Sequence, residues 1–243
     1  MLDIQLAVAK TNKYASRESG DTFEVVERPH GGFSAVLADG QGSGRSAKNV
    51  SHLVTSRAIS LIKDGTRDGV VARSVHDYLY TYKSGKVSAT LVILSVDLST
   101  NTVVLSRNSH CPILLSLPGS RGLRVLGEGT SPIGIYPMTR PVIVELPLEA
   151  GLYAVTFSDG LMDAGQRDGR PLDAAALFSQ CLQEGITTAR DIADHLLAKA
   201  LEADASRPAD DMTVLALVVG QAPQAEPNHI TPQIRRLEMQ LPV

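Results

Sequence analysis

Tryptophan is absent from the 243-residue sequence, and aromatic residues make up only 4% of it. Positive charge is not in excess either, because 23 lysines and arginines stand against 26 aspartates and glutamates, for a formal net charge of -3. A protein that binds nucleic acid normally carries a basic field. We therefore expect no nucleic-acid partner.

Cysteine is also scarce, since Cys111 and Cys181 are the only two. They lack the close, even spacing of a disulfide framework and the paired spacing of a zinc site, so we expect reduced, buried thiols. The six histidines are scattered without a short-range pair, which argues against a histidine-based metal site. Any metal bound here should therefore have oxygen ligands.

Long apolar runs are missing as well. No stretch is long enough to span a bilayer, and the first residues alternate in character where a targeting signal would have a basic and then an apolar segment. We expect a cytoplasmic protein with no membrane partner. The sequence gives no indication of its oligomeric state.

The sequence is rich in short apolar runs, and 43% of its residues are hydrophobic. Runs of Val, Ile and Leu predict strands at 4–8, 22–26, 33–37, 89–96, 102–105, 113–117, 142–146, 152–157 and 213–219. Helical spacing of apolar residues predicts helices at about 46–63, 68–82, 172–184 and 188–203. Strands grouped between pairs of helices predict a layered sandwich with largely antiparallel sheets.

Acidic residues stand at the ends of three predicted strands. Asp39 and Asp159 each end an apolar strand and begin an Asp-Gly pair, and Asp210-Asp211 comes just before the last strand. Asp-Gly is first of all a turn signal, so three independent surface turns are one interpretation. The other is that the carboxylates converge at one rim, where they suit hard divalent cations.

The order of the motifs favours the second interpretation. The sequence carries Asp39-Gly40-Gln41-Gly42-Ser43-Gly44, then Ser88-Ala89-Thr90-Leu91, then Ser158-Asp159-Gly160-Leu161-Met162-Asp163, then Asp210-Asp211-Met212-Thr213. In this order they resemble the metal-dependent protein phosphatase (PPM) family, most closely its bacterial SpoIIE, RsbU and RsbX branch. Other segments similar to that branch are Gly20-Asp21, Asn108-Ser109-His110-Cys111-Pro112 and Gly129-Thr130-Ser131-Pro132-Ile133-Gly134.

The resemblance implies an α+β fold, a four-layer αββα sandwich of two mainly antiparallel sheets flanked by helices. It covers about residues 1–220, which we expect to be the phosphatase domain, followed by a linker and strand-like tail at 221–243. Leu237, Met239, Leu241 and Val243 alternate with other residues in that tail. We expect the tail to pair with a neighbouring chain or to begin a further domain.

The resemblance also implies the site. Two Mn²⁺ or Mg²⁺ ions would be bridged by Asp39, with the Gly40 carbonyl on one ion and Asp159 and Asp210 on the other, so that Asp39, Asp159 and Asp210 are the catalytic residues. Asp21 and Asp163 match positions that act through water or on a weaker metal, and solvated carboxylates at element ends are the alternative. Asp211 would be a neighbour of the ligands.

Two cations close together lower the pKa of a bridging water, and the resulting hydroxide can attack phosphorus in line. We therefore interpret Ser43 and Ser88 as turn and packing residues, because no paired base is evident, and His110 as structural. Arg45 and Arg17 are weak candidates for binding phosphate. Gln41 stands where eukaryotic members carry a histidine that protonates the leaving oxygen, and an amide cannot supply that proton.

The expected activity is hydrolysis of phosphoserine or phosphothreonine on a small regulatory protein. The short relatives that this chain resembles act on STAS-domain antagonists of anti-sigma factors, and we take such a protein as the expected partner. The alternatives are a weakly active or inactive phosphatase-fold module that binds a partner in a stress-response signalling complex, and a structural protein stabilised by one metal site.

Overall fold

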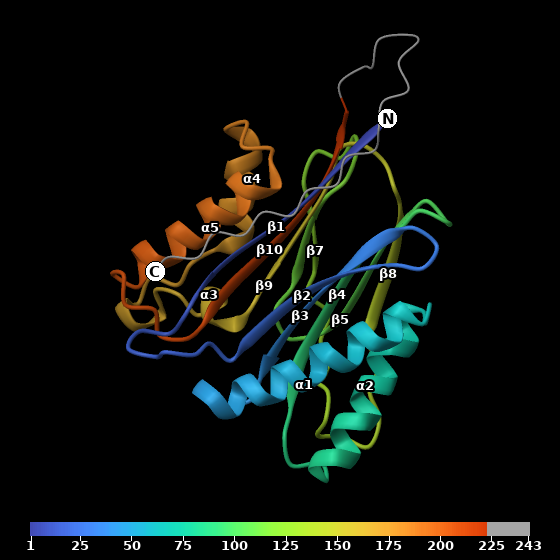
Figure 1. Cartoon of the computed structure of the whole chain (residues 1–243). Helices are drawn as coiled ribbons and strands as arrows, with labels where there is room; N and C mark the ends of the chain where they lie inside the picture. The colour runs from blue at the N-terminus through green and yellow to red at the C-terminus, as the bar shows by residue number, and fades with distance from the viewer. Residues whose placement is uncertain (223–243) are drawn as a thin grey trace.

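Two five-stranded sheets pack face to face in the computed structural model, which describes residues 1–222 (Figure 1). Within each sheet, every pairing of neighbouring strands is antiparallel. The first sheet has the order β1 (Leu2–Thr11), β10 (Met212–Gln221), β9 (Leu152–Phe157), β6 (Ile113–Ser116) and β7 (Leu123–Leu126). The second has the order β2 (Asp21–Glu27), β3 (Gly32–Gly40), β4 (Ala89–Asp97), β5 (Thr102–Asn108) and β8 (Val142–Pro147).

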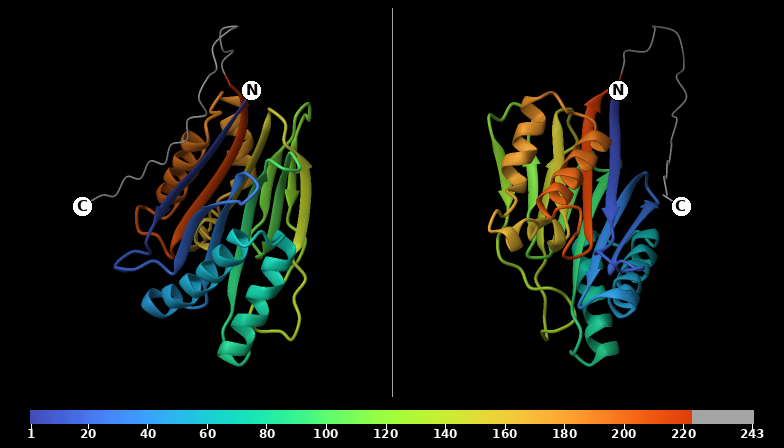
Figure 2. Two further views of the ribbon diagram at one scale, coloured as in Figure 1. Left: turned by 45° about the vertical axis from the view of Figure 1, so that its right-hand side comes forward. Right: turned by 90° about the vertical axis from the view of Figure 1, so that its left-hand side faces the viewer.

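Helices cover the outer face of each sheet (Figure 2). The helices α1 (Gly44–Lys63) and α2 (Asp68–Lys83) pack on the second sheet, and α4 (Ala174–Gln183) and α5 (Ala189–Ala203) pack on the first. A single turn, α3 (Asp159–Met162), and a 3-10 turn (Gln166–Asp168) follow β9. These four layers confirm the predicted αββα sandwich.

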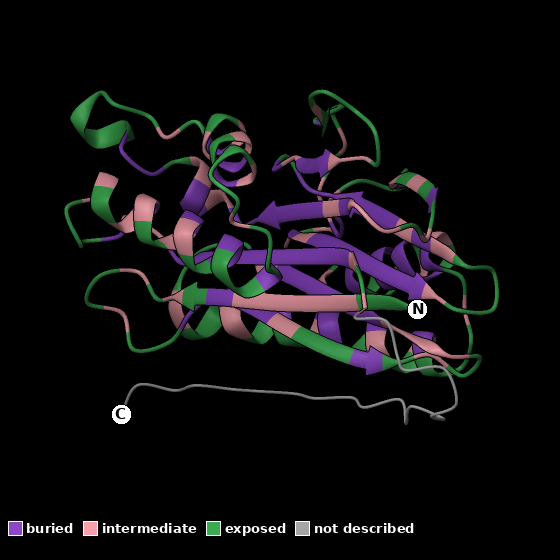
Figure 3. Cartoon of the chain, turned by 90° about the horizontal axis from the view of Figure 1, so that it is seen from above, coloured by how far each residue is buried: buried purple, intermediate pink, exposed green. Residues whose placement is uncertain are grey.

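The centre of the molecule is an apolar layer between the two sheets. Leu94 of β4 and Leu217 of β10 both belong to this layer, and each is fully buried. The strand β10 is buried from Met212 to Val219 because α5 covers its other face, which explains why Thr213 is the only polar residue in that stretch (Figure 3). Apolar packing on both faces of each sheet thus fixes the positions of the strand ends.

Most predicted elements are present, and the differences have local causes. The edge strand β7 was not predicted, because its residues Leu123–Leu126 are few and its two middle residues are exposed. The helix α3 has only four residues, too few to show helical periodicity. The predicted hairpin after β4 is confirmed, and the Asp97 carboxylate accepts the backbone N–H of Ser99 at 2.9 Å there.

The structure also describes the two cysteines and the character of the helices. Both cysteines are buried and unpaired, as predicted. Within residues 1–222, none of the helices has the length and apolar character needed to cross a membrane. The predicted strand-like tail lies outside the described residues, and the domain boundary at residue 220 stays a prediction.

Candidate metal centre

The register of the second sheet places three polar side chains in one row. Asp39 of β3 lies directly opposite Asp21 of β2 on one side and Thr90 of β4 on the other. Directly opposite residues in a sheet point to the same face. That face is the inner one, because Leu37, two residues before Asp39, belongs to the apolar layer between the sheets. The inner layer therefore ends in carboxylates.

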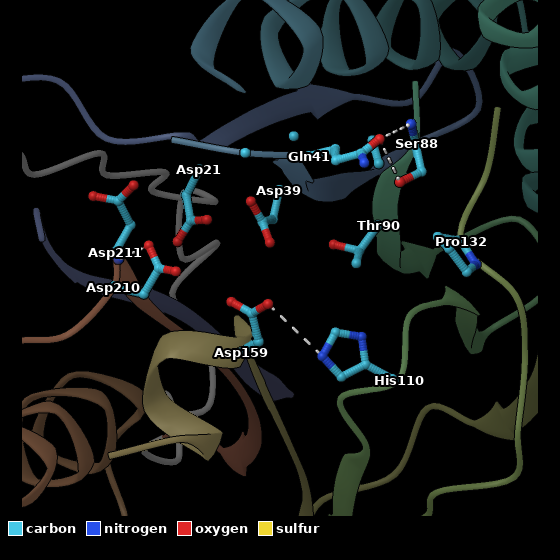
Figure 4. Close-up of a pocket in the computed structure, with 13 residues that line it drawn as sticks. Asp21, Asp39, Gln41, Ser88, Thr90, His110, Pro132, Asp159, Asp210 and Asp211 are labelled. Atoms are coloured by element: carbon cyan, nitrogen blue, oxygen red, sulfur yellow. Dashed lines mark hydrogen bonds and ion pairs between the residues drawn. The ribbon is translucent and has the colours of Figure 1, made fainter. Parts of the chain in front are cut away.

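The first sheet brings further carboxylates to the same end. Asp159 follows β9, Asp210 and Asp211 precede β10, and these two strands are antiparallel neighbours, so that the end of one lies beside the start of the other. Together with Asp21 and Asp39, they line a pocket of about 310 Å³ (Figure 4). The prediction that the strand-end carboxylates converge is confirmed as geometry.

Asp21 is held firmly in this pocket. It is only 1% exposed, and its carboxylate accepts a hydrogen bond of 2.5 Å from the hydroxyl of Thr213 on the opposite sheet. The ammonium groups of Lys10 and Lys48 both donate to its backbone carbonyl, at 2.7 and 3.0 Å. Asp21 is therefore not a solvated carboxylate at a strand end, and that alternative is wrong.

Asp211 also lines the pocket, but its carboxylate binds the backbone of the protein. Its two carboxylate oxygens accept the backbone N–H groups of Lys13 and Gly20, at 2.8 and 2.6 Å. Both oxygens thus hold the segment between β1 and β2 that leads into Asp21. This arrangement agrees with the expectation that Asp211 is a neighbour of the ligands.

Two glycines next to the aspartates permit close backbone contacts. A Cβ atom on Gly40 would lie 2.1 Å from the backbone oxygen of Ala47 in α1, and one on Gly160 would lie 2.2 Å from that of Asp211. Any side chain at either position would displace an aspartate or a helix. Gly42 has open space around it and a φ of +101°, so its role is the conformation of the turn.

The clustered carboxylates perturb one another. Burial, followed by the charges of Asp21 and Asp159, raises the pKa of Asp39 to about 8. Burial raises the pKa of Asp21 to about 6, against the hydrogen bond from Thr213. The pKa of Asp159 is also raised, first by burial and then by the charge of Asp210. Five carboxylates without a cationic side chain in the pocket lining are a fit for bound cations.

The carboxylates do not form a complete set of metal ligands by themselves, because within residues 1–222 no group of three or more His, Cys, Asp or Glu side chains could hold an ion alone. An ion in this pocket would also need other oxygen ligands, such as a backbone carbonyl or water. Asp163 is exposed and outside the pocket lining, where its carboxylate accepts from Gln166 at 2.7 Å. Of the six residues predicted for the metals, the other five line the pocket.

The side of the pocket opposite the aspartates is uncharged apart from one histidine (Figure 4). It is lined by Gln41, Ser88, Ala89, Thr90, His110 and Pro132. His110, which we expected to be structural, is half exposed, and its Nε2 lies 3.8 Å from Asp159 Oδ2. Arg17 and Arg45, the candidates for binding phosphate, are exposed and do not line the pocket.

Comparison with known proteins gives the family. A family model described as Stage II sporulation protein E (SpoIIE) matches residues 29–220, most of the chain. The chain belongs to the SpoIIE family. Stage II sporulation protein E of Bacillus subtilis (strain 168) is 22% identical to this SpoIIE-family chain over 218 residues, which are 88% of the chain and 25% of the relative. The chain thus spans about a quarter of the length of the curated relatives it matches.

Solved structures agree on the fold. The PP2C phosphatase domain of SpoIIE from Bacillus subtilis, solved with a fragment of its regulatory domain, superposes with a TM-score of 0.75 at 20% identity, over 91% of this chain and 65% of that one. RsbX in complex with magnesium superposes with a TM-score of 0.66 at 16% identity, over 90% of this chain and 100% of that one. The SpoIIE-family chain therefore has the PP2C fold, and the predicted family resemblance is confirmed.

Proposed function

We propose that this chain is a metal-dependent protein serine/threonine phosphatase. The observation that carries the proposal is the set of five carboxylates, from both sheets, around one pocket whose lining includes no lysine or arginine. Such a set is costly to fold unless cations neutralise it. Membership in the SpoIIE family also supports a phosphatase function.

In this proposal two Mn²⁺ or Mg²⁺ ions are held by Asp39, the Gly40 carbonyl, Asp159 and Asp210, with Asp21 beside them. Bound divalent cations would supply an acidified water as nucleophile and neutralise charge on the phosphoryl oxygens. The chain's own contribution is rigidity. Asp39 is fixed at the end of β3, a strand that is paired on both sides, and Asp21 is tied to the opposite sheet through Thr213. Asp163 lies outside the pocket, so its share is the smallest of the predicted set.

The pocket side chains also support a mechanism without a covalent intermediate. A nucleophilic serine needs a base within hydrogen-bond reach. The hydroxyl of Ser88 donates instead to the amide oxygen of Gln41, at 3.2 Å, and His110 approaches Asp159. These partners favour water as the attacking group.

For the substrate, we propose phosphoserine or phosphothreonine on a small regulatory protein in the cytoplasm, of the STAS-domain type. Support for this step is the sequence resemblance to short bacterial phosphatases of stress-response modules. The Asp159 side chain in the pocket is 34% exposed, so a phosphorylated residue on a protein surface could approach it. A binding module without activity is the competing function.

A phosphopeptide assay tests the proposal. We expect the chain to release phosphate from phosphoserine and phosphothreonine peptides in Mn²⁺ or Mg²⁺, and to stop when a chelator removes the ion. Phosphotyrosine peptides serve as the comparison for substrate class. Hydrolysis that persists in chelator would point to a covalent mechanism, and no hydrolysis at saturating metal would favour the binding module.

A further inference from the structure

The side of the pocket that faces the aspartates carries two hydrogen-bond donors, the Gln41 amide and the Thr90 hydroxyl, that have no acceptor among the described residues. We propose that Gln41 and Thr90 bind the phosphoryl group of the substrate as an uncharged pair of donors, and that Ser88 is the positioning residue that aims Gln41. This inference rests on the proposed phosphatase function and names the groups that recognise its substrate. It needs no arginine or lysine in the pocket.

The orientation of the Gln41 amide follows from its contact with Ser88. The backbone N–H of Ser88 can only donate, and it lies 2.9 Å from Gln41 Oε1. The Ser88 hydroxyl approaches the same oxygen at 3.2 Å, and the backbone N–H of Gln41 donates to the Ser88 carbonyl at 3.0 Å. The two contacts to Oε1 hold the amide with its oxygen toward Ser88 (Figure 4), and the backbone hydrogen bond keeps the two residues side by side. Its Nε2 must face away from Ser88.

Both donors are free for a ligand. Gln41 lines the pocket and is exposed, and within the described part of the chain its Nε2 donates no hydrogen bond. Thr90 lines the pocket too, and its hydroxyl likewise has no hydrogen-bond partner among residues 1–222. Because Thr90 lies directly opposite Asp39 in the register, its hydroxyl stands beside the proposed metal ligand.

The negative charge of the pocket favours uncharged donors over cationic side chains for binding a phosphoryl group. An arginine at this place would pair with Asp39 or Asp159 and compete with the cations. An amide and a hydroxyl bind carboxylates far more weakly, yet they donate well to a phosphoryl oxygen, which carries negative charge. The substrate's dianion would therefore lie between cations on the acidic side and these two donors on the other.

Two variants of Gln41 separate binding from structure. In Gln41→Glu the side chain keeps an oxygen for both Ser88 contacts but loses its donor and gains a negative charge. In Gln41→Met the side chain loses both the oxygen that accepts from Ser88 and the N–H donor. If Gln41 serves only to hold Ser88, the glutamate variant should bind phosphate as tightly as wild type, and the methionine variant should bind it more weakly. If Gln41 binds phosphate, both should bind it weakly, and the glutamate variant more weakly of the two.

Matched variants complete the set. Thr90→Val removes the hydroxyl at nearly constant shape, and Thr90→Ser restores it. Gln5 provides the control, because its amide oxygen also accepts a backbone N–H, from Ala189 at 3.1 Å, outside the pocket lining. Gln5→Glu and Gln5→Met should therefore leave phosphate binding unchanged.

The direct readout is the affinity of the Mg²⁺-loaded chain for inorganic phosphate, measured by calorimetry. We expect Gln41→Glu to weaken it about tenfold or more and Gln41→Met or Thr90→Val about three- to tenfold, with recovery in Thr90→Ser. The side-chain NH₂ resonances of Gln41, assigned by their loss in Gln41→Met, should shift when phosphate is added to the wild-type chain. The shift itself is measured on the wild-type chain.

Unchanged phosphate affinity in Gln41→Glu and Thr90→Val, or unshifted Gln41 resonances, would overturn the inference. Failure of the proposed function looks different, since a chain that binds phosphate through Gln41 but hydrolyses no phosphopeptide would keep this site and lose the enzyme. Peptide turnover provides the second check. The Gln41 and Thr90 variants should raise KM for a phosphoserine peptide by a similar factor, which a purely structural defect would not produce.

Discussion

Asp39→Asn should remove nearly all phosphatase turnover. Asp39 lies between Asp21 and Thr90 in the paired sheet and faces Asp159 across the pocket (Figure 4), and in the proposed metal centre it would be a ligand of both ions. Asparagine keeps the shape but offers a neutral oxygen. Because residues outside a metal's own ligands already cost about ten- to a hundredfold when replaced, we expect a loss of more than about a hundredfold in kcat/KM.

The matched changes are Asp163→Asn and Asp168→Asn. Asp163 is exposed and bound to Gln166, so its variant should keep a measurable fraction of turnover, within about tenfold of wild type. Asp168 begins another Asp-Gly pair and is not among the residues that line the pocket, so its variant should match wild type. Steady-state hydrolysis of a phosphoserine peptide measures all three. Equal, mild losses for Asp39 and Asp163 would contradict the assignment of ligands.

Bound Mn²⁺ should offset the folding stability that the metal-free chain loses as pH rises. In the metal-free chain the pKa of Asp39 is about 8, against 3.8 as the ordinary value, and that of Asp21 is about 6. The folded state therefore holds more protons than the unfolded state between about pH 4 and pH 8. By linkage, its free energy of unfolding falls as pH rises through that window, and the loss is complete above pH 8.

We expect the metal-free chain to lose about 1–3 kcal/mol of stability between pH 5 and pH 8, because burial disfavours the charged forms of Asp39 and Asp21. Mn²⁺ at about a hundred times its dissociation constant should restore about 3 kcal/mol per ion. Urea unfolding at the two pH values, with and without Mn²⁺, measures both effects. Without metal, Asp39→Asn should be more stable than wild type at pH 8. A metal-free wild type that is equally stable at both pH values would contradict the account.

The fold was predictable from the sequence because its signals are local. Apolar runs such as Leu152–Phe157 and the helical stripe of α5 stand out in any short window. The strand β7 and the helix α3 were missed because four residues carry no such signal. The layering of the two sheets came from the family resemblance. The strand order within each sheet was not predicted, since strand pairing depends on contacts between distant segments.

The candidate site was predictable only in part. Asp39, Asp159 and Asp210 stand in recognisable motifs at strand ends, and the structure brings them to one pocket. The burial of Asp21 was not visible in the sequence, because it depends on Thr213, which is 192 residues away. Ser88 and Thr90 belong to a motif that is recognisable in the sequence. The contact of Ser88 with Gln41 and the pairing of Thr90 with Asp39 follow from the register between strands, which cannot be seen in the sequence.

The most direct test is a titration of the metal-free chain with Mn²⁺, in which bound ions and turnover of a phosphoserine peptide are measured on the same samples. The account predicts that the chain binds two ions in the carboxylate pocket and that turnover rises with occupancy of the second, while Asp39→Asn binds fewer ions and stays inactive. Full turnover at one ion or fewer per chain, or two bound ions with no turnover, would contradict it.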